Sequence, residues 1–226
     1  MRVLCPLLLL LRLMPLELAA QSKPDAWTQN FDVAAADWTD RGRNPYFILE
    51  PGYALTLEHG SERLVITVLD DTRVVAGVTT RVVEERETSS GELVEVSRNF
   101  YALDRRTNSV FYFGEDVDMY KNGKVVAHDG AWTAGQNGAR FGLMMPGLPL
   151  LGAKYYQEVA PKVAMDRAEI VALAETLKTP AGTFTHVLRT TETTPLEPGV
   201  RETKSYAPGI GLIKDGDLLL AKYGGK

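Results

Sequence analysis

Two neighbouring stretches of this chain alternate apolar and polar residues with a period of two, and this pattern restricts the fold most. In residues 93–103 the apolar side chains favour even positions, with Arg98 as the exception, and in residues 110–120 they favour odd positions. The apolar positions are Val94, Val96, Phe100, Ala102, Phe111, Phe113, Val117 and Met119. Successive side chains of a strand point to opposite faces, so the pattern predicts two strands with one buried face.

Turn residues separate these stretches from further β-branched segments. Asn122-Gly123 is the clearest turn signal, because Asn-Gly readily adopts the positive φ angles of a type I′ hairpin. Other turns are indicated at Pro51-Gly52, Ser89-Ser90-Gly91, Pro180-Ala181-Gly182, Pro198-Gly199, Pro208-Gly209 and Asp215-Gly216. The spacing predicts an all-β fold, an antiparallel meander of about ten strands curled into a barrel or half-barrel.

One segment, residues 164–177, permits two interpretations. Its alanines favour a helix, whereas Ile170, Val171 and Leu173 suit a buried strand. A strand is the preferred prediction, and a helix stays open as the alternative.

The N-terminal residues 1–20 have the layout of a secretory signal peptide. A charged start is followed by the leucine-rich run Leu4–Leu13 and by the small residues Ala19-Ala20. Cys5 lies inside this segment, too early to be the acylated cysteine of a lipoprotein. We therefore expect a periplasmic or secreted chain with a leader at 21–45, in which residues 32–38 could form a short helix, and one β domain at 46–226.

Composition argues against several classes of function. The formal net charge is -4, so the chain lacks the basic surface typical of proteins that bind nucleic acids. Arg12, Pro15 and Glu17 interrupt the N-terminal apolar run, so no membrane span is expected. Asp116 and Asp118 have a calcium-like spacing but no closing glutamate. We predict no metal site and no cofactor.

Candidate catalytic residues are few, because the usual catalytic motifs are missing. His128 beside Asp129 could act as a general base, although neighbouring strand residues point to opposite faces. Glu158 and Asp166, with Glu169, could form a carboxylate pair of the kind that hydrolases use. Solvated surface residues are the more ordinary interpretation of all of them.

A glycine-rich apolar segment at 134–152 is the strongest indication of a ligand. We expect a long loop in which Gly142, Gly147 and Gly152 permit movement, covering a hollow lined by aromatic strand residues. The candidate ligand-binding residues are Phe111, Phe113, Trp132, Phe141, Leu143, Met144, Met145 and Leu148. Most aromatic residues of the chain are expected to pack in an ordinary core, and a subset that lines the hollow is the alternative.

The C-terminal third contains three motifs of a familiar kind. They are Thr179-Pro180-Ala181-Gly182-Thr183-Phe184, Val187-Leu188-Arg189 and Tyr206-Ala207-Pro208-Gly209-Ile210-Gly211-Leu212-Ile213. This pattern resembles the TapB-like bacterial exported proteins and, more distantly, the LolA/LolB lipoprotein-carrier superfamily. The resemblance implies a strongly bent antiparallel sheet around an apolar hollow and, near LolA, binding of acyl chains. It transfers no catalytic residue.

Three functions follow as expectations. The first is a soluble exported protein whose apolar cavity binds a small hydrophobic or acyl-chain ligand. The second is an exported carboxylate- or histidine-based hydrolase or lyase, and the third is a structural or protein-interaction domain. Inward-facing carboxylates would favour the enzyme, and a filled core with an exposed apolar patch would favour the interaction domain.

Overall fold

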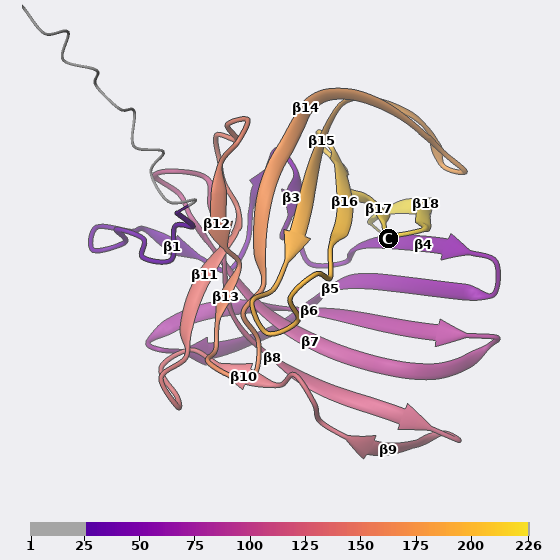
Figure 1. Cartoon of the computed structure of the whole chain (residues 1–226), viewed down its shortest axis with the longest axis horizontal. Helices are drawn as coiled ribbons and strands as arrows, with labels where there is room; N and C mark the ends of the chain where they lie inside the picture. The colour runs from indigo at the N-terminus through magenta and orange to yellow at the C-terminus, as the bar shows by residue number, and fades with distance from the viewer. Residues whose placement is uncertain (1–25, 226) are drawn as a thin grey trace, which may run out of the picture.

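A 16-stranded antiparallel sheet dominates the computed structural model, which describes residues 26–225 (Figure 1). Residues 26–225 form strands, turns and irregular segments without a helix, so the all-β prediction is confirmed. No helix long and apolar enough to cross a bilayer occurs in the described part of the chain. The expected signal peptide lies outside the described residues. More strands form than expected, because residues 38–48 contribute three short strands and residues 124–159 contribute five.

Long hairpins build the first half of the sheet. Its strands are β4 (Tyr53–His59), β5 (Glu62–Val75), β6 (Val78–Ser89), β7 (Glu92–Asp104) and β8 (Ser109–Lys121), followed by the short β9 (Lys124–Ala127). Each strand pairs with the next, and the alternation at 93–103 and 110–120 lies within β7 and β8. Asn122 and Gly123 connect β8 to β9 with φ angles of 52° and 72°. The hairpin prediction is therefore confirmed.

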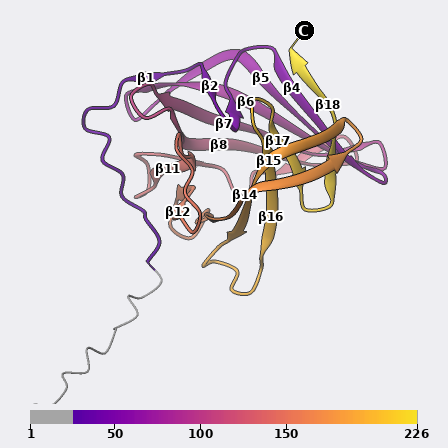
Figure 2. The ribbon, with the colours of Figure 1, turned by 90° about the horizontal axis from the view of Figure 1, so that it is seen from above.

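The second half crosses the first at a steep angle. Its strands are β14 (Arg167–Thr179), β15 (Gly182–Thr193), β16 (Glu202–Ala207), β17 (Gly211–Asp215) and β18 (Leu218–Gly225). Strands β14, β15 and β16 stand upright in Figure 1 where β4 to β8 fan out sideways, and Figure 2 places β14 to β17 against one side of that fan. Residues 167–177 are part of a strand, as preferred from the sequence.

The sheet nearly closes on itself. Strand β18 pairs with β4, with Leu220 opposite Leu57, so the last strand lies beside the first strand of the long hairpins. The strand order begins at β12 (Lys154–Tyr156) and ends at β13 (Glu158–Val159), which pairs with β11 (Arg140–Met145). Gln157 alone separates β12 from β13 in the chain. We call residues 154–159 the seam.

The segment before β4 packs against the sheet and contains no helix at 32–38. Its strands are β1 (Trp38–Thr39), which pairs with β7, and the hairpin β2 (Arg43–Asn44) and β3 (Phe47–Ile48). Residues 33–36 form a turn in which the Ala36 N–H donates to the Val33 carbonyl at 3.0 Å. The helix expectation was wrong because this segment is too short to propagate a helix and instead anchors Trp38 on the sheet.

Residues 140–145 of the expected glycine-rich loop form strand β11, which pairs with β8. Gly142 and Gly147 serve close packing: an added Cβ would lie 2.3 Å from the Gln157 carbonyl oxygen at Gly142 and 1.9 Å from the Thr107 carbonyl oxygen at Gly147. The prediction of a long mobile loop was therefore wrong for residues 140–145. The remaining segment, residues 146–153, exposes Leu148, Leu150 and Leu151 by 78%, 63% and 67% of their surface.

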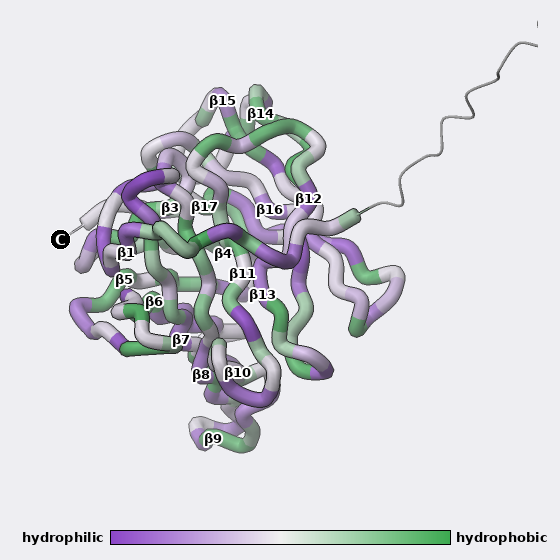
Figure 3. Tube along the Cα trace, turned by 90° about the vertical axis from the view of Figure 1, so that its left-hand side faces the viewer, coloured by the Kyte–Doolittle hydropathy of each residue, from purple (hydrophilic) through white to green (hydrophobic). Residues whose placement is uncertain are grey.

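The two faces of the sheet are packed differently. Figure 3 shows apolar and polar residues alternating along the strands, as expected for a sheet with two distinct faces. One face is filled by a cluster of rings that we call the aromatic cluster. Its members are Phe31, Trp38, Phe111, Phe113 and Phe141. The opposite face, the inner face, curves around a hollow.

Candidate functional site

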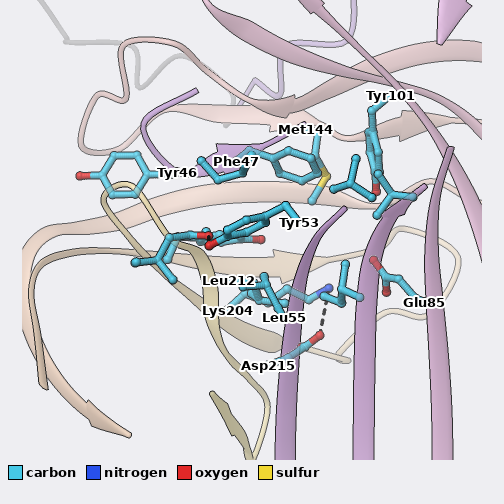
Figure 4. A pocket seen from close by; sticks show the side chains of 17 residues that line it. Tyr46, Phe47, Tyr53, Leu55, Glu85, Tyr101, Met144, Lys204, Leu212 and Asp215 are labelled. Carbon is cyan, nitrogen blue, oxygen red and sulfur yellow. Dashed lines mark hydrogen bonds and ion pairs between the residues drawn. The ribbon is translucent and has the colours of Figure 1, made fainter. Parts of the chain in front are cut away.

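A pocket lies on the inner face between strands β4 to β6 and strands β16 and β17 (Figure 4). Apolar side chains make up most of its wall, and three charged side chains make up one end. The lining residues are Tyr46, Phe47, Ile48, Tyr53, Leu55, Ile66, Val68, Val83, Glu85, Tyr101, Met144, Lys204, Tyr206, Ile210, Gly211, Leu212 and Asp215. The cavity volume is about 70 Å³, so the pocket is small.

The apolar end is built by strand alternation and by the β2–β3 hairpin. Leu55 and Ile66 are register partners on β4 and β5, so their side chains point to the same face. The Phe47 ring packs edge-on against Tyr101, with ring centroids 5.0 Å apart. Asn44 is buried and holds the hairpin, because its side-chain amide donates to the carbonyls of Asn108 and Pro146 at 2.7 and 3.1 Å.

Tyr53 fixes the far side of this end. Its hydroxyl donates to the Ile210 carbonyl at 2.8 Å, which joins the loop before β17 to β4. Burial raises the pKa of Tyr53 to about 12, so the phenol stays neutral and contributes its apolar ring to the wall. The apolar wall is thus held by hydrogen bonds behind it.

The polar end is centred on Lys204 of β16. Its Nζ lies 3.4 Å from Glu192 Oε2 and 3.5 Å from Asp215 Oδ2. The Glu192 charge raises the pKa of Lys204 well above its usual value, so the ammonium is charged at neutral pH. Figure 4 shows the Lys204–Asp215 pair at the base of the pocket, with the Glu85 carboxyl nearby.

Carboxyl groups surround this lysine. Burial raises the pKa of Glu85 to about 7, and it likewise raises that of Glu115 to about 7. Burial is also the main cause of the raised pKa values of Glu87, Glu95, Glu158, Asp166 and Glu202. A desolvated carboxyl near other carboxyls resists ionisation. Near neutral pH, some carboxyls at this end of the hollow are therefore protonated and others are ionised.

The seam carries a concentration of buried polar atoms without a hydrogen-bond partner in residues 26–225. They are Tyr155 Oη, Gln157 Oε1 and Glu158 Oε2, together with Trp132 Nε1. The Trp132 indole is close enough to Glu158 to favour the charged form of that carboxyl, but not in hydrogen-bond geometry. Buried polar groups are normally paired, so such a concentration needs an explanation.

Gln157 connects the seam to the pocket. Its side-chain amide donates to Glu192 Oε1 at 3.1 Å, and the same nitrogen lies 3.7 Å from Met144 Sδ. Met144 lines the pocket, and Glu192 pairs with Lys204, which also lines it. Gly142 permits this arrangement, because a side chain there would collide with the Gln157 backbone.

The candidate ligand-binding residues from the sequence fall in several places. Of the eight, Met144 alone lines the pocket. Phe111, Phe113 and Phe141 belong to the aromatic cluster on the other face, and Leu143 packs against the core. Met145 is fully buried, Leu148 is exposed in the loop, and Trp132 packs edge-on against Tyr112 with centroids 5.4 Å apart.

The structure brings together two of the three candidate catalytic residues. The Asp166 carbonyl accepts the N–H groups of Gln157 and Glu158 at 2.8 and 3.3 Å, so Glu158 and Asp166 are neighbours. His128 lies elsewhere, largely exposed, with Nδ1 3.1 Å from Asp118 Oδ1 and 2.7 Å from the Val117 carbonyl oxygen. Glu115, which sequence reasoning missed, lies close enough to Glu158 to raise its pKa.

Most pocket residues also escaped sequence reasoning. Leu64, Ile66 and Val68 alternate on β5, and this signal of an inward face was available. Glu85 and Lys204 gave no signal, because a charged residue in a strand is normally read as solvent-facing. Within residues 26–225, no group of three His, Cys, Asp or Glu residues is placed to hold a metal ion.

Comparison of the chain with protein-family models, with curated proteins and with solved structures gave no match.

Proposed function

We propose that this protein binds a small, elongated apolar or amphipathic molecule in the inner-face pocket. The observation that carries the proposal is a hollow with an apolar wall and a single charged end. Small-molecule sites are typically concave and mostly apolar, with a few polar groups that orient the ligand. We further propose that the chain acts after export, as its N-terminal pattern predicts, and N-terminal sequencing of the exported protein should then start near Gln21.

The small volume of the pocket favours a single slender chain over a fused ring system. A cavity of about 150 Å³ is known to accept one benzene ring, whereas this pocket offers about 70 Å³. A linear alkyl chain would enter it with one end only, placing its terminal group at Glu85, Lys204 and Asp215 and leaving the rest of the chain at the open side. Met144 at the wall can adapt its flexible side chain to the ligand.

Binding of n-decanol tests this proposal, because the alcohol is neutral and has the required shape. Isothermal titration calorimetry should show one site per chain. The variant Ile66→Trp fills the pocket from β5 and should weaken decanol binding at least tenfold. Val65→Trp is the matched control, since the neighbouring side chain points to the other face, and its affinity should match that of the wild type.

Two outcomes would refute the proposal. If decanol gives no heat of binding with the wild-type protein and does not shift its unfolding midpoint, the protein has no such site. Equal loss of binding in both tryptophan variants would place the site elsewhere. Circular dichroism of both variants shows whether the sheet is intact.

A second candidate function is acid–base catalysis by Glu115 and Glu158. The favouring observation is that burial raises the pKa of both carboxyls, that of Glu115 to about 7, and that the Glu115 charge further raises the pKa of Glu158. Such a group can donate and accept protons near neutral pH. Glu115 also lines a separate opening of about 190 Å³ with Asp116 and Trp132. Hydrolysis of a glycoside or ester substrate that is lost in Glu115→Gln would support this candidate over binding alone.

A further inference from the structure

The inner face presents many more negative than positive groups to the hollow. The charged and titratable groups in and beside it are Glu85 on β6, Glu95 on β7, Glu115 on β8, Glu158 on β13, Glu192 on β15, Lys204 on β16 and Asp215 on β17, whereas Glu87, Asp166 and Glu202 lie nearby at exposed positions. Tyr53, Tyr101, Tyr112, Tyr155 and Tyr206 face the same region as neutral phenols. Lys204 is the cation that these carboxyl groups share.

Lys204 is already neutralised. Its ammonium pairs with Glu192 and Asp215, which together outweigh its single charge. Glu85, Glu87, Glu95, Glu115, Glu158 and Glu202 form no ion pair within residues 26–225, and Asp166 forms none either. Elsewhere in the fold a buried charge is fully matched: Arg81, 1% exposed, binds Asp40 and donates to the Asp70 carbonyl at 2.7 Å. The imbalance is therefore specific to the hollow.

An independent observation indicates what is lacking there. Gln157 and Glu158 are 5% and 7% exposed, and each has an acceptor oxygen without a donor in the described part of the chain. The Gln157 amide nitrogen donates to Glu192, which pairs with Lys204 of the pocket, so the side chain that carries the free oxygen lies beside this ion pair. A buried acceptor without a donor is costly, by roughly 1–3 kcal/mol. A cationic hydrogen-bond donor would balance the excess negative charge of this end and would also satisfy its free acceptor oxygens.

We infer that the ligand of the pocket is a cationic amphiphile, an apolar chain that ends in an ammonium group. This inference rests on the proposed binding function and names the class of its ligand. The alkyl chain of the ligand lies among Leu55, Ile66 and Leu212, and its ammonium lies between Glu85 and the Gln157–Glu192 pair. An ammonium has three N–H donors and no acceptor, so it suits acceptor oxygens and carboxylates. A fatty-acid carboxylate would add another negative charge at the same place.

Three ligands of equal chain length separate this inference from the proposed function. They are n-decylamine, n-decanol and n-decanoate, titrated by calorimetry into the full exported chain at pH 8. We expect decylamine to bind at least tenfold more tightly than decanol, and decanoate to bind most weakly. Equal affinities, or tightest binding of decanoate, would overturn the cationic ligand and leave the apolar pocket standing. Binding of none would overturn both.

The pH dependence supplies a second test. An alkyl ammonium stays charged between pH 5.5 and 8, because its pKa is close to that of lysine, about 10.4. Glu85 and Glu115 ionise across this interval, since each has a pKa of about 7. The ratio of decylamine to decanol affinity should therefore rise severalfold from pH 5.5 to pH 8. A constant ratio would mean that these carboxyls do not meet the head group.

Variants with matched geometry locate the head group. Glu85→Gln keeps the shape of the side chain and removes its charge, so it should lower decylamine affinity at least threefold without changing decanol affinity. Glu175→Gln is the control, because Glu175 is exposed and pairs with Arg189 on the surface. Decanol binding reports whether each variant is folded. Unchanged decylamine affinity in Glu85→Gln would place the ammonium elsewhere and refute this assignment.

Discussion

Both faces of strand β8 carry aromatic residues, at the successive positions 111, 112 and 113. One face packs into a filled core, whereas the other borders a hollow. Phe111 and Phe113 meet Trp38 with centroids 5.3 and 5.5 Å away, and Phe141 fills the space beside them. On the opposite face, Tyr112 stacks on Tyr101 at 4.7 Å, and the next inward residue is the carboxyl Glu115.

The difference arises from what covers each face. The leader brings Phe31 and Trp38 onto the phenylalanine face and completes it with rings. The inner face is covered by strands β16 and β17 and by the seam, which contribute carboxyls, Lys204 and an amide. Alternation therefore identifies residues that share a face, whereas the chemistry of a remote segment decides whether that face becomes core or site.

Large-to-small substitutions should separate the two faces most clearly. Phe113 is fully buried in the aromatic cluster, and Phe113→Ala should cost about 3–5 kcal/mol, because its neighbours cannot collapse into the space. Ile66 borders the hollow, and Ile66→Ala should cost about 1 kcal/mol, since it removes contacts on one side only. Urea unfolding measures both values. Equal costs would mean that the inner face is packed as tightly as the outer one.

Any side chain placed at position 142 should destabilise the packing of β11 against the seam. A Cβ there would lie 2.3 Å from the Gln157 carbonyl oxygen and 2.6 Å from that of Tyr156. Gly142→Ala should therefore destabilise the fold by about 2–3 kcal/mol through forced backbone displacement. Gly225→Ala is the control, because the nearest atom would be 3.8 Å away. An unfolding midpoint unchanged in Gly142→Ala would show that the seam does not cross β11 in this way.

The carboxyls of the inner face should make the protein less stable as the pH rises. Their pKa values are raised in the folded chain, to about 7 for Glu85 and Glu115. The folded state therefore keeps protons that the unfolded state has released above pH 4.5, and stability falls as the pH rises from about 5 to 8, on the order of 2 kcal/mol. Lys204 contributes no slope there, because its pKa is raised above an already high value.

Urea unfolding at pH 5 and pH 8 measures this slope without ligand. Glu85→Gln should reduce the difference between the two values, whereas a substitution at the exposed Glu175 should leave it unchanged. A stability that is constant or rises over this interval would contradict the burial of these carboxyls.

The smallest effect is expected at His128. Its ring is largely exposed beside Asp118, just after strand β9, and it does not line the pocket. His128→Ala should change stability by less than about 0.5 kcal/mol and should leave decanol and decylamine binding unchanged. A large loss of any catalytic activity in this variant would favour the histidine-based enzyme over the binding protein.

Local signals of strand and turn could be read from the sequence with good success. The alternation in β7 and β8 and the Asn122-Gly123 hairpin depend on neighbouring residues, and both formed as predicted. The sequence after Asn122-Gly123 predicts one return strand over 124–133, but β9 ends at Ala127, because the turn before Trp132 depends on contacts with β8. Period and turn chemistry are local, whereas strand ends depend on partners.

The site could not be predicted because its parts come from remote segments. Glycine at 142 and 147 suggested mobility, but these glycines allow two backbones to touch, which only the assembled sheet reveals. Glu85 and Lys204 look like solvent-facing strand residues until β16 is placed opposite β6. Family membership near the TapB-like or LolA-like proteins stays a prediction, because the bent sheet alone does not distinguish among families that share it.

The pairing of β18 with β4 has a consequence for how this chain folds. Leu57 and Leu220 become neighbours only after nearly the whole chain is present, and a sheet completed by such distant partners folds slowly, because loop closure must precede the contacts that stabilise it. Before β18 arrives, β4 presents an unpaired edge, which invites pairing with another molecule. We therefore expect refolding to depend on protein concentration, with aggregation competing at the stage where β4 waits for its partner. A chain that crosses a membrane in extended form would meet this hazard on the far side, where a chaperone that binds edge strands would increase the yield.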